Sequence, residues 1–300
     1  MKPIIKVCGM RDADNIRAVE ALGADWMGFI FWPGSKRYVA EPPTYLPLKA
    51  KRVGVFVDAT INDILQHVAG YRLDAIQLHG NESPDFLRAL RTALHAPHDS
   101  CSCPVCSGRT ALTSHHASHQ AGDSHHALHV VGGSPAYICL IKAFSIATPR
   151  DLAATEAYAG LADYFLFDTK AAPVPDAAPI PDAAPIPDAF TSGSPMAKAA
   201  PVPDGSPSGS PVAKVAAPSL PGGTGCQFDW SILSAYHGNT PFLLSGGIGA
   251  NDAQRLRALR ALDGFPIEQC VGIDLNSRFE VAPALKDINK LKEFIKELSI

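Results

Sequence analysis

Tyr164-Phe165-Leu166-Phe167-Asp168 is a short apolar run that ends on a carboxylate, and seven comparable runs occur along the chain. Near-continuous apolar runs of this length are typical of parallel strands that are covered on both faces. The other runs are Ile4–Val7, Trp26–Phe31, Val53–Val57, Ala75–Leu78, Ile138–Ile141, Phe242–Leu244 and Cys270–Ile273. The sequence therefore predicts eight parallel strands.

Segments with helical patterns lie between these runs. Ser83-Pro84 combines an N-cap residue with proline at the first helical position, and Thr148-Pro149 repeats this arrangement. Asp287 precedes apolar residues at helical spacing, and further helices are expected near Tyr45–Lys49 and Asp229–Tyr236. Eight strand–helix alternations predict an α/β fold of the closed (β/α)8 TIM barrel type. An open doubly wound sheet is the alternative, although the turn after the first run lacks the Gly-x-Gly-x-x-Gly of a dinucleotide site.

The composition is that of a soluble globular chain without a basic surplus. Of the 300 residues, 46% are apolar and 18% are charged, and the net charge is -3 at pH 7. This balance argues against nucleic acid and an anionic membrane surface as partners. No apolar stretch approaches the ~20 residues that span a bilayer, and the start of the chain lacks the apolar region of a secretory signal. The odd number of cysteines, 7, indicates reduced thiols and a cytoplasmic location.

An insertion rich in histidine and cysteine is expected at residues 97–136, between the fourth helix and the fifth strand. Eight of the 11 histidines of the chain lie in or beside it, and six of them follow Cys101, Cys103 and Cys106. Thiolates and imidazoles bind zinc and copper, but this spacing is not that of a zinc finger. We expect a low-complexity loop on the face of the barrel away from catalysis, and no specific metal site.

A proline-rich insertion is expected at residues 172–220, between the sixth strand and the sixth helix. The hexamer Ala-Ala-Pro-(Val/Ile)-Pro-Asp recurs there, and half of the 26 prolines lie between Pro173 and Pro221. Alternating prolines remove backbone donors and favour polyproline II. We expect expanded low-complexity sequence on the catalytic face of the barrel, with a tethered lid or a partner-docking segment as the alternative. Both insertions are taken to interrupt one barrel domain that spans residues 1–300.

Polar side chains follow the apolar runs, and the ends of parallel strands meet at one rim of a barrel. The residues at these ends include Cys8, Asp58, His79, Lys142, Asp168 and Asp274. A thiolate is a competent base when its pKa is lowered, and a carboxyl is a competent acid when burial raises its pKa. Cys8 and Asp168 are therefore a candidate acid/base pair, with a small buried core cysteine as the alternative for Cys8.

Glycines after the late strands predict a phosphate site. Gly222–Gly225 precedes the sixth helix, Ser245–Gly249 follows the seventh strand, and Asn276–Arg278 follows the eighth. Glycine lets backbone N–H groups approach an anion closely, and the loops after strands seven and eight are the usual phosphate site of this fold. Arg37, after the second strand, is a candidate for binding a carboxylate bidentately, with a solvated loop arginine as its alternative.

Many motifs occur in a fixed order across essentially all of the chain outside the insertions. They are Lys6–Met10, Gly23–Asp25, Gly28–Phe31, Ser35–Tyr38, Val53–Val57, Gln77–Gly80, Asp168–Lys170, Gly222–Gly225, Phe228–Trp230, Leu244–Gly247 and Asp274. In these motifs the chain resembles the phosphoribosylanthranilate isomerase family. The resemblance implies an isomerase that interconverts an aldose and a ketose by an Amadori rearrangement without a cofactor. The substrate would be N-(5-phosphoribosyl)anthranilate, in the third step of tryptophan biosynthesis from chorismate.

The resemblance also implies a role for individual residues. Cys8 is implied as the general base, Asp168 as the general acid, and Arg37 as the residue that holds the anthranilate carboxylate. The residues implied to bind phosphate are Gly223, Gly225, Gly246, Gly247 and Ser277. Supporting polar residues without an assigned step are Gln77, His79 and Asp274.

Departures from the family pattern fall in the phosphate loops. Cys226-Gln227 stands where members often carry lysine, and Arg278 stands where they often carry glycine. Two other functions are weighed against the isomerase: a histidine-pathway type of phosphosugar isomerase, which typically uses two aspartates, and a metal-binding or scaffold protein on a degenerate barrel. The expected partner is the small-molecule substrate, and the expected state is a monomer or a homodimer.

Overall fold

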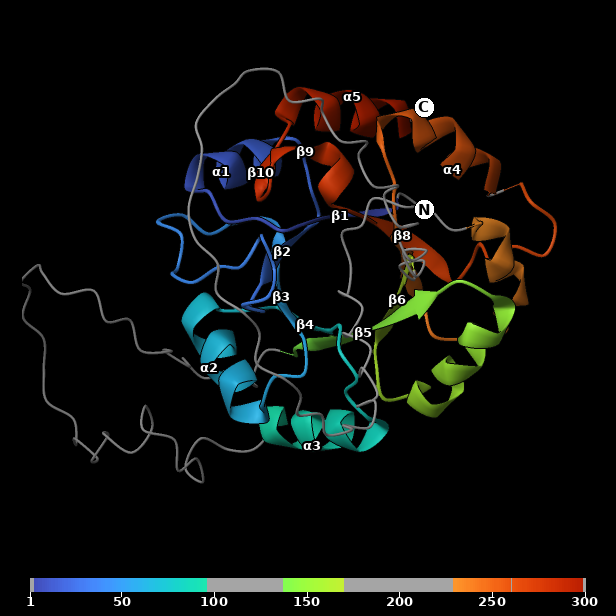
Figure 1. Cartoon of the computed structure of the whole chain (residues 1–300), viewed down its shortest axis with the longest axis horizontal. Coiled ribbons are helices and arrows are strands. Elements are labelled where there is room, and N and C mark those ends of the chain that lie inside the picture. Colours follow the sequence, from blue (N-terminus) through green and yellow to red (C-terminus); the bar gives the residue numbers. More distant parts are fainter. Residues whose placement is uncertain (1–2, 96–136, 170–228, 260, 299–300) are drawn as a thin grey trace, which may run out of the picture. The chain divides into compact units, whose positions relative to one another are not determined.

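The structure, a computed structural model, describes residues 3–95, 137–169, 229–259 and 261–298. Eight parallel strands close into a barrel in chain order, with β1 hydrogen-bonded to β8 (Figure 1). They are β1 (Ile4–Cys8), β2 (Trp26–Ile30), β3 (Lys51–Phe56), β4 (Ala75–Leu78), β5 (Cys139–Ile146), β6 (Tyr164–Thr169), β7 (Phe242–Leu244) and β8 (Cys270–Leu275). The predicted closed barrel is confirmed, and the open sheet is wrong.

Helices surround this ring of strands (Figure 1). The α-helices are α1 (Ala13–Ala21), α2 (Ile61–Tyr71), α3 (Pro84–His95), α4 (Ala253–Leu259) and α5 (Ile288–Leu298). The 3-10 helices are η2 (Pro149–Tyr158), η3 (Trp230–Ala235), η4 (Ala250–Asp252) and η5 (Ser277–Phe279). After η5, strands β9 (Glu280–Ala282) and β10 (Leu285–Lys286) form a small antiparallel sheet. The predicted starts at Pro84 and Pro149 are confirmed, although the second begins a 3-10 helix.

The prediction of a helix near Tyr45–Lys49 is wrong, because the connection from β2 to β3 is irregular. Glu20, near the end of α1, fixes this connection. Its carboxylate accepts hydrogen bonds from the Tyr45 hydroxyl at 2.5 Å and from the backbone N–H groups of Lys49 and Ala50 at 2.6 and 3.1 Å. Pro47 also interrupts the segment and supplies no backbone donor for a helical turn.

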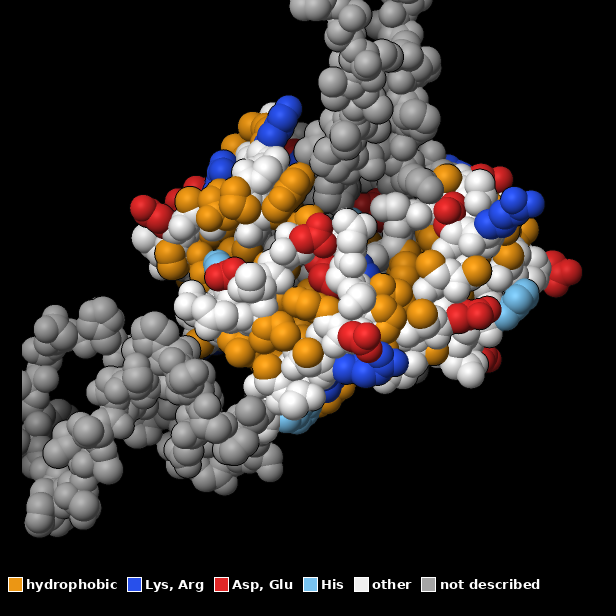
Figure 2. Space-filling model, turned by 60° about the horizontal axis from the view of Figure 1, so that its bottom comes forward, with side chains coloured by type: hydrophobic (Ala, Val, Ile, Leu, Met, Phe, Trp, Pro, Cys, Tyr) orange, Lys and Arg blue, Asp and Glu red, His pale blue; other side chains and the backbone are white. Residues whose placement is uncertain are grey.

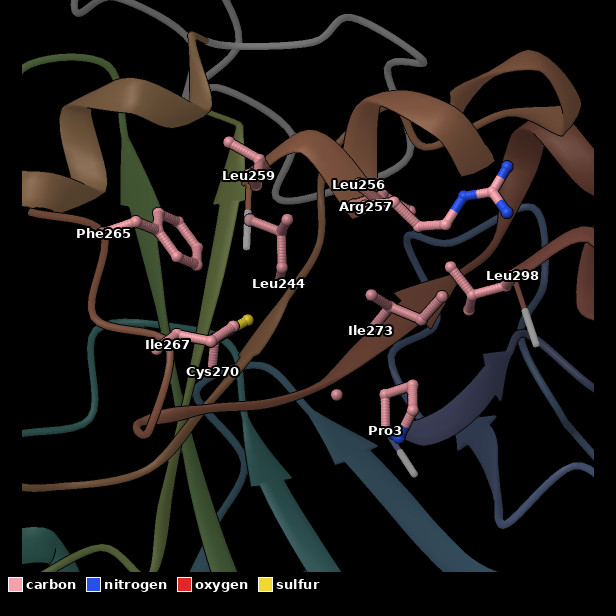
Figure 3. Close-up of a pocket in the computed structure, with 11 residues that line it drawn as sticks. Pro3, Leu244, Leu256, Arg257, Leu259, Phe265, Ile267, Cys270, Ile273 and Leu298 are labelled. Carbon is pink, nitrogen blue, oxygen red and sulfur yellow. The ribbon is translucent and has the colours of Figure 1, made fainter. Parts of the chain in front are cut away.

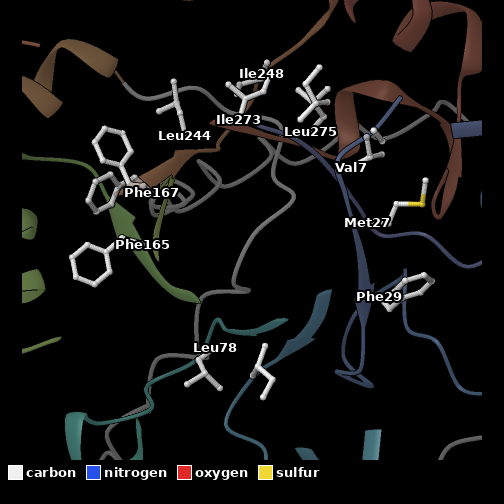
Figure 4. Packing of buried hydrophobic residues seen from close by; sticks show 14 of the residues in the cluster. Val7, Met27, Phe29, Leu78, Phe165, Phe167, Leu244, Ile248, Ile273 and Leu275 are labelled. Atoms are coloured by element: carbon white, nitrogen blue, oxygen red, sulfur yellow. The ribbon is translucent and has the colours of Figure 1, made fainter. Parts of the chain in front are cut away.

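Side chains along the strands alternate between two environments. Those shown in Figure 4 point away from the barrel centre and pack in the layer beneath the helices; they include Val7, Met27, Phe29, Leu78, Phe165, Phe167 and Leu275. A second cluster fills the inside, from Trp26, Val53, Ala75, Ile141, Ala143, Leu166 and Leu243. Further along their strands, Cys8, Ile30 and Val55 form a third cluster. The apolar filling therefore ends below the rim, and the rim is left to polar side chains.

Lys142 does not end its strand, as the apolar run predicts, because β5 continues to Ile146. It shares its face of β5 with Phe144 and Ile146, which pack in the outer layer. Its ammonium group donates to Glu82 Oε2 at 3.0 Å and to the carbonyl oxygen of Gly80 at 2.7 Å. Lys142 therefore belongs to the layer outside the barrel and not to the rim.

The two predicted insertions, 97–136 and 172–220, lie outside the described residues. Within the described ranges, no helix is long and apolar enough to cross a membrane. On the face shown in Figure 2, basic side chains stand apart, with acidic, apolar and uncharged ones between them. The described residues also contain no group of three or more His, Cys, Asp or Glu side chains that could hold a metal ion.

Candidate active site

Cys8 ends β1 on the inward face of the barrel. It lies beside Gly28 in the parallel register of β1 and β2, and a Cβ atom at residue 28 would be 2.6 Å from the sulfur. Only glycine leaves room for the thiol there. Burial raises the pKa of the Cys8 thiol, while the positive charge of Lys6 acts to lower it. The acid/base prediction needs a lowered thiol pKa, and in the protein without a ligand burial acts in the opposite direction.

A buried ion pair lies one inward position below the thiol. Lys6 and Asp274 face each other in the register of β1 and β8, and Lys6 Nζ donates to Asp274 Oδ1 at 2.8 Å. Burial acts to lower the pKa of Lys6, but its interactions with Asp274 and Cys8 together outweigh burial and the pKa is raised. The pair therefore keeps a positive charge near Cys8, where it favours the thiolate.

Asp168 lies one residue before the end of β6 and faces the end of β4. Its side chain is buried, and Oδ2 lies 3.6 Å from Nε2 of His79. Gln77 Nε2 donates to His79 Nδ1 at 3.0 Å, so the neutral imidazole carries its proton on Nε2, facing the carboxylate. Burial, and then the charges of Lys142 and Lys6, lower the pKa of His79 to about 3. The imidazole is therefore neutral at physiological pH.

Two polar atoms on this side of the rim lack a partner. Gln77 Oε1 and His79 Nε2 are buried and accept or donate no hydrogen bond within the described part of the chain. Buried polar groups are almost always hydrogen-bonded, and exceptions often mark a functional role. The two side chains predicted as supporting residues therefore offer an acceptor and a donor to a bound molecule.

Arg37 comes to the rim from the loop after β2. Glu280 of β9 binds one edge of its guanidinium, with Nε 2.8 Å from Oε1 and Nη2 2.7 Å from Oε2. Gly9, directly after Cys8, has a φ of 78°, and a Cβ there would lie 2.6 Å from Arg37 Cδ. The side chain of Arg37 thus lies against the backbone that follows Cys8. The predicted carboxylate-binding residue and the predicted base are neighbours.

The loops after β7 and β8 lie side by side, as a shared phosphate site requires. Gly246 and Gly247 follow β7 in the left-handed region, with φ of 88° and 67°. Ser277 opens η5 after β8, and the stem of Arg278 passes so near Gly249 that a Cβ there would lie 3.1 Å from Arg278 Cδ. The remaining predicted phosphate residues lie outside the described ranges: Gly223 and Gly225.

The pocket in Figure 3 is a different feature, on the outer side of the barrel wall. It is lined by side chains of β7, β8, α4 and α5 that are apolar, with Arg257 as the charged exception. It contains none of the predicted site residues. The predicted acid/base pair and the predicted anion-binding residues therefore lie elsewhere, at the strand ends.

Comparison with known proteins shows to which family the chain belongs. The family model described as N-(5'phosphoribosyl)anthranilate (PRA) isomerase matches residues 5–101 and 208–297. The chain belongs to the PRA isomerase family. The N-(5'-phosphoribosyl)anthranilate isomerase of Parabacteroides distasonis is 37% identical over 98% of this chain and 93% of its own length. That of Phocaeicola vulgatus is 37% identical over 98% of this chain and 97% of its own length.

Solved structures of PRA isomerases share the fold. The enzyme from Thermus thermophilus has a TM-score of 0.59 at 20% identity, and 98% of each chain is covered. A PRA isomerase in complex with reduced 1-(o-carboxyphenylamino)-1-deoxyribulose 5-phosphate has a TM-score of 0.56 at 20% identity, with 99% of each chain covered. The family membership inferred from the motifs is confirmed.

Three charged residues at the rim are not among those predicted: Lys6, Glu280 and Lys286. Lys6 carries a usable signal, because it is a lysine two positions before Cys8 within an apolar run, on the same strand face. Glu280 and Lys286 carry none. Their importance depends on how β9 and β10 fold back towards the loop after β2, which no local pattern indicates.

Proposed function

We propose that the chain catalyses the Amadori rearrangement of N-(5-phosphoribosyl)anthranilate, with Asp168 as general acid and Cys8 as general base. Asp168 protonates the ribose ring oxygen while its bond to C1 breaks, and the nitrogen lone pair forms a C1=N Schiff base. Cys8 then removes the C2 proton, and the electrons of that C–H bond form a C1=C2 double bond and neutralise the nitrogen. The enolamine tautomerises to 1-(2-carboxyphenylamino)-1-deoxyribulose 5-phosphate. Hydrogen moves within the substrate, so no oxidant is consumed.

The observation that carries this proposal is that two buried proton-transferring groups end different strands at one end of the barrel. Cys8 is 3% exposed at the end of β1, and Asp168 is 7% exposed near the end of β6. Ring opening needs an acid at the ring oxygen, and the next step needs a base at C2. Because Asp168 and Cys8 come from separate strands, one can reach the ring oxygen and the other the C2 proton of the same sugar.

The substrate's two anionic groups have separate counterparts. Arg37 is proposed to bind the anthranilate carboxylate, because a guanidinium pairs bidentately with planar carboxylates. Gly246, Gly247 and Ser277 are proposed to bind the phosphate together with Gly223 and Gly225. Backbone N–H groups of glycine loops approach phosphate oxygens closely because no side chain intervenes.

The raised pKa of Cys8 is compatible with a base that acts after the ring has opened. The Schiff base carries a positive charge on nitrogen, and a nearby positive charge favours a thiolate. Lys6 acts in the same direction throughout. The proposed order, with Asp168 first and Cys8 second, therefore supplies the charge that deprotonates the thiol when the base is needed.

Complementation tests the activity as a whole. A tryptophan auxotroph that lacks the isomerase should grow when it expresses this chain, and failure by a well-expressed, folded protein would overturn the activity. Cys8→Ala and Asp168→Asn should each lower kcat by roughly 10²- to 10⁴-fold. Near-normal kcat in either variant would remove that residue from its role. Cys139→Ala, which removes a partly buried thiol at the start of β5, is the control and should leave kcat unchanged.

We also propose a cytoplasmic enzyme whose partner is its small-molecule substrate, without nucleic acid, as a monomer or a homodimer. One solved relative with a TM-score of 0.55, from Thermotoga maritima, is described as a monomer generated from a dimeric enzyme. Light scattering over a range of protein concentrations distinguishes the two states. A larger assembly would contradict this part of the proposal.

A further inference from the structure

Glu280 occupies one edge of the Arg37 guanidinium. Nε donates to Oε1 at 2.8 Å and to Oε2 at 3.1 Å, and Nη2 donates to Oε2 at 2.7 Å. A guanidinium has five N–H groups, and this contact uses Nε–H and one Nη2–H. The second Nη2–H and one Nη1–H form the other edge, and Nη1 makes no hydrogen bond to a described residue. Arg37 therefore presents one edge to Glu280 and keeps the other for a ligand.

Glu280 is itself held from several directions. Lys286 Nζ donates to Glu280 Oε1 at 2.7 Å and to Asn276 Oδ1 at 2.9 Å. The backbone of Lys286 exchanges two hydrogen bonds with the side chain of Asn15 in α1, at 2.8 and 2.9 Å. The backbone N–H of Ala284 donates to Glu280 Oε1 at 3.2 Å. The carboxylate is thus anchored through Lys286 to β10, to α1 and to Asn276 after β8.

The charges of this cluster do not cancel. Arg37 and Lys286 bring two positive charges against one carboxylate, and the side chains are 14%, 0% and 5% exposed for Arg37, Lys286 and Glu280. Burial acts to raise the pKa of Glu280, but its bonds with Arg37 and Lys286 outweigh it and lower the pKa. A buried, uncompensated positive charge is unfavourable until an anion binds. A carboxylate at the open edge of Arg37 would complete the cluster.

We propose that Glu280 and Lys286 are positioning residues that hold Arg37 in the orientation that receives the substrate carboxylate. This inference rests on the proposed function and extends it to two residues that do not touch the reacting atoms. Lys286 fixes Glu280, Glu280 fixes the Nε edge of Arg37, and Arg37 binds the carboxylate through its Nη edge. Specificity for a substrate with a carboxylate on the aromatic ring is then set by β9 and β10 as well as by Arg37.

Glu280→Gln tests the inference with nearly unchanged shape. The variant loses the charge-assisted contact, so KM for phosphoribosylanthranilate should rise roughly 10- to 100-fold while kcat stays within about 3-fold. The analogue N-(5-phosphoribosyl)aniline has no carboxylate, so its KM should be the same for wild type and variant. An equal rise in KM for both compounds would overturn the proposal, because it would indicate general damage to the site.

Glu82→Gln is the matched control. Glu82 is also a buried glutamate paired with a buried lysine, Lys142, at 3.0 Å, but in the layer outside the barrel. Both variants should lower the urea midpoint of unfolding, whereas only Glu280→Gln should raise KM for the carboxylated substrate. If Glu82→Gln raises that KM equally, the effect is one of stability and the proposal is wrong.

A double-mutant cycle tests whether Glu280 acts through Arg37. In an Arg37→Ala background, Glu280→Gln should cause no further rise in KM. A further rise of tenfold would contradict the inference, since Glu280 would then act on the substrate by another route.

Calorimetric binding of anthranilate provides a readout that does not depend on turnover. Binding should weaken in Glu280→Gln and stay unchanged in Glu82→Gln. A wild type that binds anthranilate but does not isomerise the substrate would refute the proposed function alone. Equal binding by wild type and Glu280→Gln would refute the positioning role alone.

Discussion

Two sides of the barrel rim differ in whether their polar groups have partners. One side is formed by β1, β8 and β9, and the other by β4 and β6. On the first side, each buried carboxylate is bound by cations: Asp274 by Lys6 at 2.8 Å, and Glu280 by both Arg37 and Lys286 at 2.7 Å. Such pairs hold their geometry before any ligand arrives, because breaking one leaves a charge buried without a partner. The side chains of this side, Arg37 among them, are therefore preorganised for the anion that we propose they bind.

The β4–β6 side carries a neutral imidazole beside Asp168 and is incompletely hydrogen-bonded. His79 is uncharged, and both its Nε2 atom and Gln77 Oε1 lack a partner within the described ranges. Asp168 lies 3.6 Å from that Nε2, beyond hydrogen-bonding distance. The difference teaches that the proposed carboxylate-binding residue, Arg37, and the proposed acid, Asp168, lie in different surroundings, while the proposed base, Cys8, lies on the side of Arg37. In the proposed mechanism, the paired charges hold the substrate carboxylate, and neutral groups without hydrogen-bond partners lie beside the acid.

Loss of one residue from each side should separate kcat from KM, and this is the largest expected effect. Asp168→Asn keeps the shape of the acid but cannot donate its proton, so kcat should fall roughly 10²- to 10⁴-fold with KM little changed. Arg37→Ala should instead raise KM by about 100-fold or more and lower kcat less. Steady-state kinetics with phosphoribosylanthranilate measure both. If Arg37→Ala lowers kcat as much as Asp168→Asn does, the division of roles between Arg37 and Asp168 is wrong.

Removal of one charge from the paired side should destabilise the fold. Lys6→Met leaves Asp274 buried without a cation, and the free energy of unfolding should fall by about 3–5 kcal/mol. Lys6→Met combined with Asp274→Leu should recover most of this loss, since an apolar pair needs no compensation. Urea unfolding of the three proteins measures the difference. A single variant as stable as wild type would show that the pair carries no strong coupling.

The barrel could be predicted from the sequence because its strands are covered on both faces. The apolar runs are therefore continuous and easy to count. Prediction failed where tertiary contacts replaced local preference. Glu20 of α1 holds the connection after β2, and no helix forms near Tyr45–Lys49. Lys142 interrupts an apolar run, yet it lies inside β5, because its charge is met by Glu82 from another element.

The site was predictable to the extent that its residues follow strands. Cys8 and Asp168 stand out as reactive groups directly after apolar runs, and the barrel topology brings such positions to one rim. Glu280 has no such signal, because it lies 243 positions from its partner Arg37 and in a short hairpin. The sequence therefore indicates candidate reactive groups, but not the groups that hold the site residues in place.

Acid should destabilise the β4–β6 side through His79. The folded state holds the pKa of His79 at about 3, whereas an unfolded histidine titrates near 6.5. Below pH 6.5 His79 binds a proton in the unfolded chain but stays neutral in the folded chain. The contribution of the neutral imidazole to folding stability is therefore complete above pH 6.5 and is lost as the pH falls towards 3. Between pH 6.5 and 5 the loss amounts to about 2 kcal/mol.

Urea unfolding at pH 7 and pH 5 measures this contribution. His79→Asn should lose less stability over the interval than wild type, by about 2 kcal/mol. His237→Asn, at an exposed histidine, is the control and should follow wild type. If His79→Asn also follows wild type, the imidazole is accessible to protons in the folded state and does not stay neutral.

Gln77 should set the tautomer of His79, with the smallest effect on activity. Gln77→Leu removes the donor to Nδ1, a neutral hydrogen bond worth about 0.5–1.5 kcal/mol, so kcat should fall only about 2- to 10-fold. Nitrogen-15 NMR reports the cause directly: wild-type His79 should show a protonated Nε2 and a bare Nδ1, and the variant a mixture of tautomers. A wild-type spectrum with a protonated Nδ1 would mean that Gln77 faces His79 with its Oε1 atom and not with its Nε2 atom. His79 Nε2 would then face Asp168 as a hydrogen-bond acceptor, whereas the tautomer described above faces Asp168 with an Nε2–H donor.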